Sequence, residues 1–191
     1  MLWAAMLLAF HGFLRVSEYT ASHTTKFNPM TTLSVHDVRI ISPSAITVYI
    51  KASKTDPFRQ GTTLRLFANA SHLCPVNALL PYLSAHPTGT GPLFQWHDGR
   101  YFTRSGLAAT LKKIKPQHIM NMSSHSFRIG AATTVAAAGY PRWLIQALGR
   151  WTSNCFRDYI RIPEHTLQRV SLSLSQNLPI APVPFDPDNI S

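Results

Sequence analysis

The side chains of this sequence that could do chemistry are basic groups and hydroxyls rather than clustered carboxylates. The eight Asp and Glu residues are scattered along the chain, and two of them lie beyond residue 176. A two-metal nuclease needs several carboxylates close together, and a phosphate-binding loop needs closely spaced glycines; the sequence contains neither. Nine histidines and two cysteines also lack the spacing of a zinc site. We therefore expect no metal, no cofactor and no small-molecule substrate.

Cleaving a phosphodiester bond without a metal ion requires the protein to supply three functions. Arg is suited to neutralise the non-bridging oxygens, because its planar guanidinium forms bidentate hydrogen bonds with phosphate. Lys or His is suited to protonate the departing oxygen, and a hydroxyl is suited to attack phosphorus. The pattern of interest is therefore Arg, Lys and His placed to converge on one Tyr, Ser or Thr.

The pattern His-x-x-Arg occurs three times. His36 and Arg39 fall in a predicted strand, where this odd spacing sends their side chains to opposite faces. The second occurrence, His97–Arg100, spans a predicted turn. His125 and Arg128 instead open a predicted helix, where they share one face at the end whose N–H groups favour anions. The alternative is that His125 and Arg128 only decorate a helix start.

A candidate nucleophile lies further along the chain. The segment Leu148–Ser153 precedes a predicted helix that contains Tyr159–Arg161. The phenol of Tyr159 could attack phosphorus. The competing interpretation is an ordinary half-buried core tyrosine.

Taken together, these residues resemble the catalytic domain of the tyrosine recombinases, also called phage integrases. The resemblance runs from Arg15 to Tyr159 and so covers most of the chain. Each motif alone is weak, but five motifs in the family's order form a strong signal. The Gly-Arg-Trp and Tyr-Ile-Arg motifs are more similar to eukaryotic versions carried by mobile elements than to bacterial ones. The matching segments are Phe10–Glu18, Lys54, His125–Arg128, Leu148–Gly149 and Tyr159–Arg161.

The resemblance implies a role for each matching residue. Arg15 and Arg128 would clamp the scissile phosphate, and His125 would act as acid or base on the nucleophile. Lys54, on the loop between the second and third predicted strands, would protonate the departing 5′ oxygen. Tyr159 would attack, giving a 3′-phosphotyrosyl bond and a 5′ hydroxyl. Attack of that hydroxyl on another phosphotyrosine would rejoin DNA without ATP.

Two lysines compete for the proton-donor role, and one acidic residue has two interpretations. Lys51 is a rival of Lys54, although its predicted place inside a strand fits less well, and Lys54 can also be an ordinary turn lysine. Glu18 matches an acidic position of the family that orients the site; alternatively it only forms a salt bridge.

One position departs from the family pattern. The family has His or Trp directly after the Leu-Gly pair, and here Arg150 stands there with Trp151 next. Counting back from Tyr159 favours Arg150, whereas chemistry favours Trp151, whose indole N–H can donate to phosphate. Arg150 can also donate, so this departure does not itself imply inactivity.

The elements that must position these residues are mainly helices. Apolar residues at helical spacing predict a buried helix over Met1–Phe13 that breaks near Gly12. Alternating β-branched segments predict three antiparallel strands. The fold class is therefore α+β, a mainly helical domain with a small three-stranded sheet. The predicted strands are 33–41, 45–52 and 62–67; further helices are predicted over 75–85, 103–114, 124–139, 141–149, 153–161 and up to about 174.

Composition indicates the partner and the compartment. Lys and Arg total 18 against 8 Asp and Glu, giving a net charge of +10, which favours a nucleic acid as partner over an acidic membrane or a charge that only keeps the protein soluble. The resemblance implies that this nucleic acid is double-stranded DNA. Two cysteines suit a reducing compartment. The apolar start lacks a basic lead and a cleavage site, so we expect no secretion. The expected location is the nucleus for a eukaryotic source and the cytoplasm otherwise.

The organisation predicted from the resemblance is one recombinase-like catalytic domain over 1–175 and a Pro-containing tail over 176–191, without the family's N-terminal DNA-clamp domain. The family usually assembles as tetramers on DNA. The leading hypothesis is a site-specific recombinase or integrase. The alternatives are a decayed or domesticated DNA-binding domain and a type IB topoisomerase.

Overall fold

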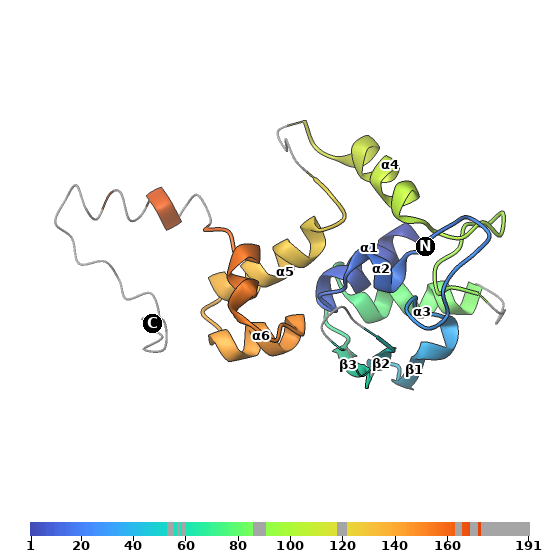
Figure 1. Ribbon diagram of the computed structural model, residues 1–191, viewed down its shortest axis with the longest axis horizontal. Coiled ribbons are helices and arrows are strands. Elements are labelled where there is room, and N and C mark those ends of the chain that lie inside the picture. Colours follow the sequence, from blue (N-terminus) through green and yellow to red (C-terminus); the bar gives the residue numbers. More distant parts are fainter. Residues whose placement is uncertain are drawn as a thin grey trace. The chain divides into compact units, whose positions relative to one another are not determined.

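The computed structural model describes residues 1–52, 56, 58, 60–85, 91–117, 122–162, 166–168 and 172. It divides into two compact units, Met1–Arg128 and Ile129–Ser191. Figure 1 shows a mainly helical chain with one small sheet, as the sequence predicts. The single domain predicted over 1–175 stays a prediction. The predicted tail over 176–191 and most of the helix predicted up to about residue 174 lie outside the described residues.

The core of the first unit is built around helix α1 (Leu2–His11) and helix α3 (Pro75–Ala85), which contact each other. Helix α1 is apolar on nearly every side, which is typical of a buried helix. It ends at Gly12, as predicted, where the Gly12 N–H donates to the Leu8 carbonyl at 2.9 Å. Helix α3 starts at a proline, whose missing N–H costs nothing at that position.

The three predicted strands form one antiparallel sheet in the order β1-β2-β3. Strand alternation places Ile46, Val48 and Ile50 in the core, together with Leu66 of the third strand. The sheet thereby covers one side of the helical core and leaves its other face to solvent. The strands are β1 (Val38–Ser42), β2 (Ala45–Ile50) and β3 (Thr62–Phe67).

The prediction for the start of the first strand was wrong. Residues predicted as strand from Leu33 onward instead form a short 3-10 helix, η1 (Val35–Asp37), before β1 begins. The Asp37 carboxylate accepts hydrogen bonds from the Ser34 N–H at 2.7 Å and from the Ser34 hydroxyl at 2.8 Å. This Ser-x-x-Asp contact is a helix-start motif, and it closes a turn where the pattern of apolar residues alone predicts extended chain.

The remaining helices mostly begin and end where the sequence signals place them. The Thr103 hydroxyl caps α4 by accepting from the Gly106 N–H at 3.1 Å. Gly139, with φ 78°, follows α5 as the predicted glycine past a helix end. The helix predicted over 153–161 is a shorter 3-10 helix, η2. The bounds are α2 (Val16–Tyr19), α4 (Arg104–Ile114), α5 (Ser126–Ala137), α6 (Arg142–Gly149) and η2 (Asn154–Tyr159).

None of the helices in the described ranges combines the length and the hydropathy that a membrane crossing would need.

Candidate active site

Arg15 is held at the start of a short helix by the carboxylate of Glu18. Arg15 directly precedes α2, and its backbone N–H donates to Glu18 Oε2 at 2.9 Å. Its guanidinium Nη1 also contacts Glu18 Oε1 at 3.3 Å. Because Glu18 is only 2% exposed, this ion pair is shielded from water and fixes the Arg15 side chain better than a surface pair would. The salt bridge considered for Glu18 is therefore present, and it orients Arg15.

Arg128 is the most deeply buried basic residue described in the first unit, with 1% of its surface exposed. It lies in the first turn of α5, and its guanidinium Nη1 donates to the backbone carbonyl of Phe13. Phe13 lies two residues before Arg15, so the Arg128 side chain contacts the segment that carries Arg15. The structure thus brings both predicted clamp arginines to one stretch of chain within the first unit.

Phe13 has a left-handed backbone, with φ 50°. That conformation is unfavourable for a residue with a side chain and costs on the order of 1–3 kcal/mol. It occurs where α1 has ended and the chain turns toward Arg15, and the Phe13 carbonyl there accepts from Arg128. The sequence could not reveal this contact, because the accepting group is a main-chain carbonyl that every residue type carries.

His125 lies directly before α5 and is exposed. The turn around it is closed by serines: the Ser123 N–H donates to Ser126 Oγ at 2.9 Å, and the His125 N–H donates to Ser123 Oγ at 3.3 Å. The sequence predicted that His125 and Arg128 share one face of a helix. In the structure their surroundings differ, because the His125 side chain is exposed and the Arg128 side chain is buried.

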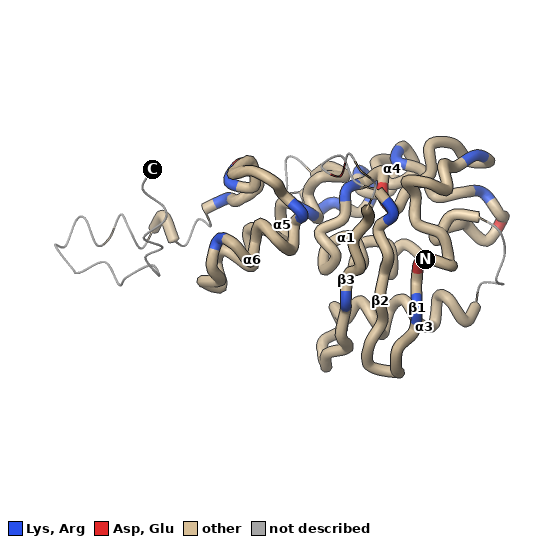
Figure 2. The backbone as a smooth tube through the Cα atoms, turned by 60° about the horizontal axis from the view of Figure 1, so that its bottom comes forward, with Lys and Arg blue, Asp and Glu red and all other residues tan. Residues whose placement is uncertain are grey.

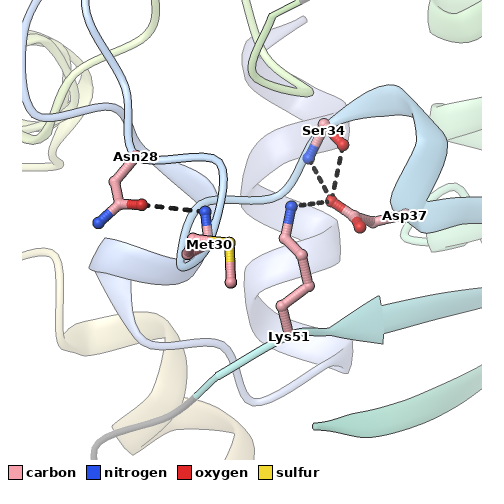
Figure 3. Close-up of polar contacts among 5 residues, drawn as sticks. All are labelled: Asn28, Met30, Ser34, Asp37 and Lys51. Atoms are coloured by element: carbon pink, nitrogen blue, oxygen red, sulfur yellow. Dashed lines mark hydrogen bonds and ion pairs between the residues drawn. The ribbon is translucent and has the colours of Figure 1, made fainter. Parts of the chain in front are cut away.

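Of the two competing lysines, only Lys51 lies within the described residues. It follows β2 rather than lying inside it, and its ammonium contacts Asp37 Oδ2 at 2.6 Å. Figure 3 shows this Lys51 side chain reaching the same carboxylate that accepts from Ser34. This contact gives Lys51 a structural role, tying the end of β2 to η1. Lys54 lies outside the described residues, and its role stays a prediction.

In the second unit, Tyr159 is the last residue of η2 and is half-buried. Its ring lies 5.1 Å from the ring of Trp151, centroid to centroid, at an interplanar angle of 53°. Trp151 is 6% exposed and also contacts the Phe156 ring at 6.2 Å. The candidate nucleophile therefore rests on a buried aromatic pair rather than lying in the core itself.

The Gly149–Trp151 segment forms a tight turn after α6. A Cβ on Gly149 would lie 1.6 Å from an atom of the Trp151 ring, so only glycine leaves room for the indole. Arg150 has a left-handed backbone, with φ 56° and ψ 43°, and its N–H donates to the Ala147 carbonyl at 3.0 Å. Trp151 is thus the neighbour of Tyr159, whereas Arg150 forms the turn that leads to Trp151.

The described residues also contain buried tyrosines that are poor nucleophile candidates. Tyr19 is 1% exposed, and burial raises the pKa of its phenol. Burial likewise raises the pKa of Tyr82, partly offset by the hydrogen bond from the Gln95 N–H. Both phenols are held neutral and away from solvent, so neither suits attack on a DNA phosphate. Tyr159 therefore remains the candidate nucleophile.

The predicted site residues are thus divided between the two units. Arg15, Glu18, His125 and Arg128 belong to the first unit, and Arg150, Trp151 and Tyr159 belong to the second. Figure 2 shows Lys and Arg positions in both units and fewer Asp and Glu positions. Within the described residues, no group of three or more His, Cys, Asp or Glu side chains could hold a metal ion. That all the site residues surround one phosphate stays a prediction.

Comparison with known proteins finds similar folds among solved structures. No protein-family model and no curated protein sequence matches the chain. Among solved structures, the XerH site-specific recombinase bound to palindromic difH substrate, a post-cleavage complex, matches with a TM-score of 0.60 and 14% identity. That match covers 91% of this chain and 45% of the recombinase. The Tn1549 transposon integrase in complex with circular intermediate DNA matches with a TM-score of 0.51 and 12% identity, covering 90% of this chain and 59% of the integrase.

The fold is that of the tyrosine recombinase catalytic domain. The resemblance read from the sequence is confirmed at this level by the XerH recombinase and the Tn1549 integrase. The chain spans about half the length of the structures that it matches. Its similarity to eukaryotic mobile-element versions stays a prediction.

Proposed function

We propose that this chain cleaves and rejoins double-stranded DNA through a 3′-phosphotyrosyl intermediate, in the site-specific recombination or integration of a mobile element. The observation that carries the proposal is the contact of buried Arg128 with the Phe13 carbonyl, two residues before Arg15. A pair of arginines fixed on one stretch of chain suits the two non-bridging oxygens of a phosphate. The recombinase fold and the family order of the motifs support the same reading.

The proposed cleavage step uses five side chains. The Tyr159 phenol attacks phosphorus and loses its proton to His125, while Arg15 and Arg128 stabilise the charge on the non-bridging oxygens. The bond between phosphorus and the 5′ oxygen breaks as Lys54 donates a proton to that oxygen. A bond between phosphorus and the Tyr159 oxygen replaces it, so the number of phosphate ester bonds is unchanged.

Rejoining is the reverse of this step. A 5′ hydroxyl attacks the phosphotyrosine, the phenol leaves and regains its proton, and a phosphodiester bond forms. Because one ester replaces another of similar energy, no ATP is needed. Because the basic side chains supply the charge stabilisation and the proton transfer that a metal ion would provide, EDTA should not inhibit. When the attacking hydroxyl comes from a different strand, the product is recombinant DNA.

A covalent trap tests the proposal without knowledge of the target sequence. The probe is a pool of short duplexes with a fixed bridging 5′-phosphorothiolate and randomised flanks, because a departing thiol rejoins poorly and lets the adduct accumulate. We expect a denaturation-resistant protein–DNA adduct that is absent in Tyr159→Phe and present in the control Tyr140→Phe, whose side chain is exposed. An adduct that persists in Tyr159→Phe would refute Tyr159 as the nucleophile.

The same preparation separates the alternative functions on supercoiled plasmid. Recombinant products that depend on Tyr159 support the recombinase, and relaxation alone supports a type IB topoisomerase-like activity. Binding without any adduct supports a decayed DNA-binding domain. The observation that favours decay is Arg150, a turn residue in left-handed conformation where the family has His or Trp. If the chain is decayed at this position only, Arg150→His should increase adduct formation.

Assembly and location belong to the same proposal. We propose that four copies of the chain assemble as a tetramer on two DNA sites. We also propose that the protein is located in the nucleus if its source is eukaryotic and in the cytoplasm otherwise. Light scattering of the DNA complex tests the first statement, and a fluorescent fusion in host cells tests the second. A complex with one chain per duplex at saturation would contradict the tetramer, and exclusion of the fusion from the nucleus would contradict the location.

A further inference from the structure

A single side-chain hydroxyl contacts the main chain at two points near the end of η2, at Tyr159 and at Arg161. Thr133 of α5 donates from Oγ1 to the Tyr159 carbonyl at 3.3 Å and accepts from the Arg161 N–H at 3.1 Å. A hydroxyl has one donor and two acceptor positions, so it satisfies both contacts at once. The two contacts lie on either side of Ile160, the residue that directly follows η2.

This use of a helical hydroxyl differs from the other described examples in the chain. Ser and Thr side chains in or next to a helix commonly donate to the carbonyl four residues earlier in the same helix. Among the described residues, three hydroxyls do so: Thr20 to Val16 at 2.6 Å, Ser84 to Leu80 at 3.1 Å and Thr110 to Gly106 at 2.9 Å. Thr133 instead contacts a segment 26 to 28 residues further along the chain.

The Thr133 hydroxyl contacts the Tyr159 carbonyl at the end of a helix. Tyr159 is the terminal residue of a 3-10 helix, and helix ends fray. Its ring is already fixed against Trp151. With Thr133 holding the carbonyl, the main chain and the ring are held from two directions, which sets where the phenol oxygen points.

We infer that Thr133 is a positioning residue for Tyr159. The inference rests on the proposed function, in which Tyr159 attacks phosphorus in line with the departing oxygen. Such an attack depends steeply on geometry, since a misplacement of about 1 Å can cost about a hundredfold in rate. Thr133 contributes alignment, and it takes no part in proton transfer or in DNA affinity.

Thr133→Val tests the inference because it keeps the branched shape and removes the hydroxyl. At saturating protein, we expect the rate of adduct formation with the phosphorothiolate pool to fall about tenfold or more, with half-saturation unchanged. Thr133→Ser, which keeps the hydroxyl, should stay within about threefold of the wild-type rate. The matched control is Thr134→Val, the same substitution at the exposed neighbouring position, which should behave as wild type.

A measurement that needs no activity accompanies the rates. In Thr133→Val, the Arg161 amide should exchange its proton faster with solvent, and nuclear Overhauser contacts between the Tyr159 and Trp151 rings should weaken. Wild-type rates in Thr133→Val, or an equal loss in Thr133→Ser, would overturn the inference. If the wild-type protein forms no adduct, the proposed function fails. The ring contacts then decide the inference alone: weaker contacts in Thr133→Val support it, and unchanged contacts overturn it.

Discussion

At the scale of single residues, the two arginines of the candidate site are held by oxygen acceptors of two kinds. Arg15 is held by a buried carboxylate, and Arg128 by a main-chain carbonyl in strained backbone. Both arrangements fix a planar guanidinium in place before any DNA binds. A group that is fixed beforehand stabilises a transition state without the cost of reorganising during the reaction. The two arginines are therefore suited to act on the rate more than on affinity.

For Arg128, the expected result of substitution is a loss of chemistry with little loss of binding. Arg128→Ala should abolish adduct formation while weakening DNA binding only modestly, because one arginine acts on transition-state charge and many basic residues share affinity. Adduct yield and fluorescence anisotropy with the same duplex pool measure the two effects. Arg65→Ala, an exposed change on β3, is the control for charge loss. Equal collapse of binding and chemistry in Arg128→Ala would contradict this role.

A second residue-scale prediction concerns the buried Tyr19 hydroxyl, which has no hydrogen-bond partner among the described residues. Tyr19→Phe should stabilise the protein by about 1 kcal/mol at neutral pH, since an unsatisfied buried polar group is costly. Burial raises the pKa of the Tyr19 phenol in the folded protein, so above pH about 10 the unfolded chain loses this proton while the folded protein keeps it. The free energy of unfolding of the wild type therefore falls as pH rises above about 10. The advantage of Tyr19→Phe should therefore grow above pH about 10.

Urea unfolding at neutral and alkaline pH measures the effect of Tyr19→Phe. The comparison is Tyr82→Phe, because the Tyr82 hydroxyl donates to the Leu93 carbonyl at 2.9 Å and accepts from the Gln95 N–H at 3.0 Å. That variant should be less stable than wild type at neutral pH. Destabilisation of similar size in both variants would contradict the unpartnered state of the Tyr19 hydroxyl.

At the scale of elements, the sequence predicted the parts whose start and stop signals are local. The helix over Pro75–Ala85 follows from its leading proline, and the Arg104–Ile114 helix from the Thr103 cap. The 3-10 turn before β1 was missed, although Ser34 and Asp37 carry the helix-start motif that could have revealed it. Contacts made through main-chain atoms, such as those of Phe13, leave no mark on residue type and could not be predicted.

The turn after α6 yields an element-scale prediction. Gly149→Ala should cost about 1–3 kcal/mol of stability, because a new methyl group in the space of the Trp151 ring forces the ring to move. Displacing that ring also removes the surface against which Tyr159 rests, so adduct formation should fall as well. Chemical denaturation and the adduct assay measure the two effects.

The control for Gly149→Ala is the same substitution at Gly106 in α4. There the nearest atom to the new Cβ is Thr103 Oγ1 at 3.3 Å, and alanine favours a helix. The capping hydroxyl must give way by only a few tenths of an ångström, so Gly106→Ala should cost much less than Gly149→Ala. A neutral Gly149→Ala would show that the indole can shift without cost.

At the scale of the whole molecule, the dominant feature is a formal charge of +10 distributed over both units. Binding to duplex DNA should release condensed counterions, so the logarithm of the affinity should fall linearly with the logarithm of salt concentration. For contacts to six phosphates, the loss between 50 and 200 mM salt is about a thousandfold. Anisotropy titrations at several salt concentrations give the slope, and Tyr159→Phe should reproduce it. Affinity that does not change with salt would contradict phosphate binding.

The contact between Arg128 and the Phe13 carbonyl does not depend on the side chain at position 13. Because every amino acid carries that oxygen, saturation mutagenesis would score position 13 only for side-chain bulk and for tolerance of the left-handed backbone. Such a screen would not detect the acceptor for Arg128, and relatives could carry another side chain that fits this buried position while keeping the contact.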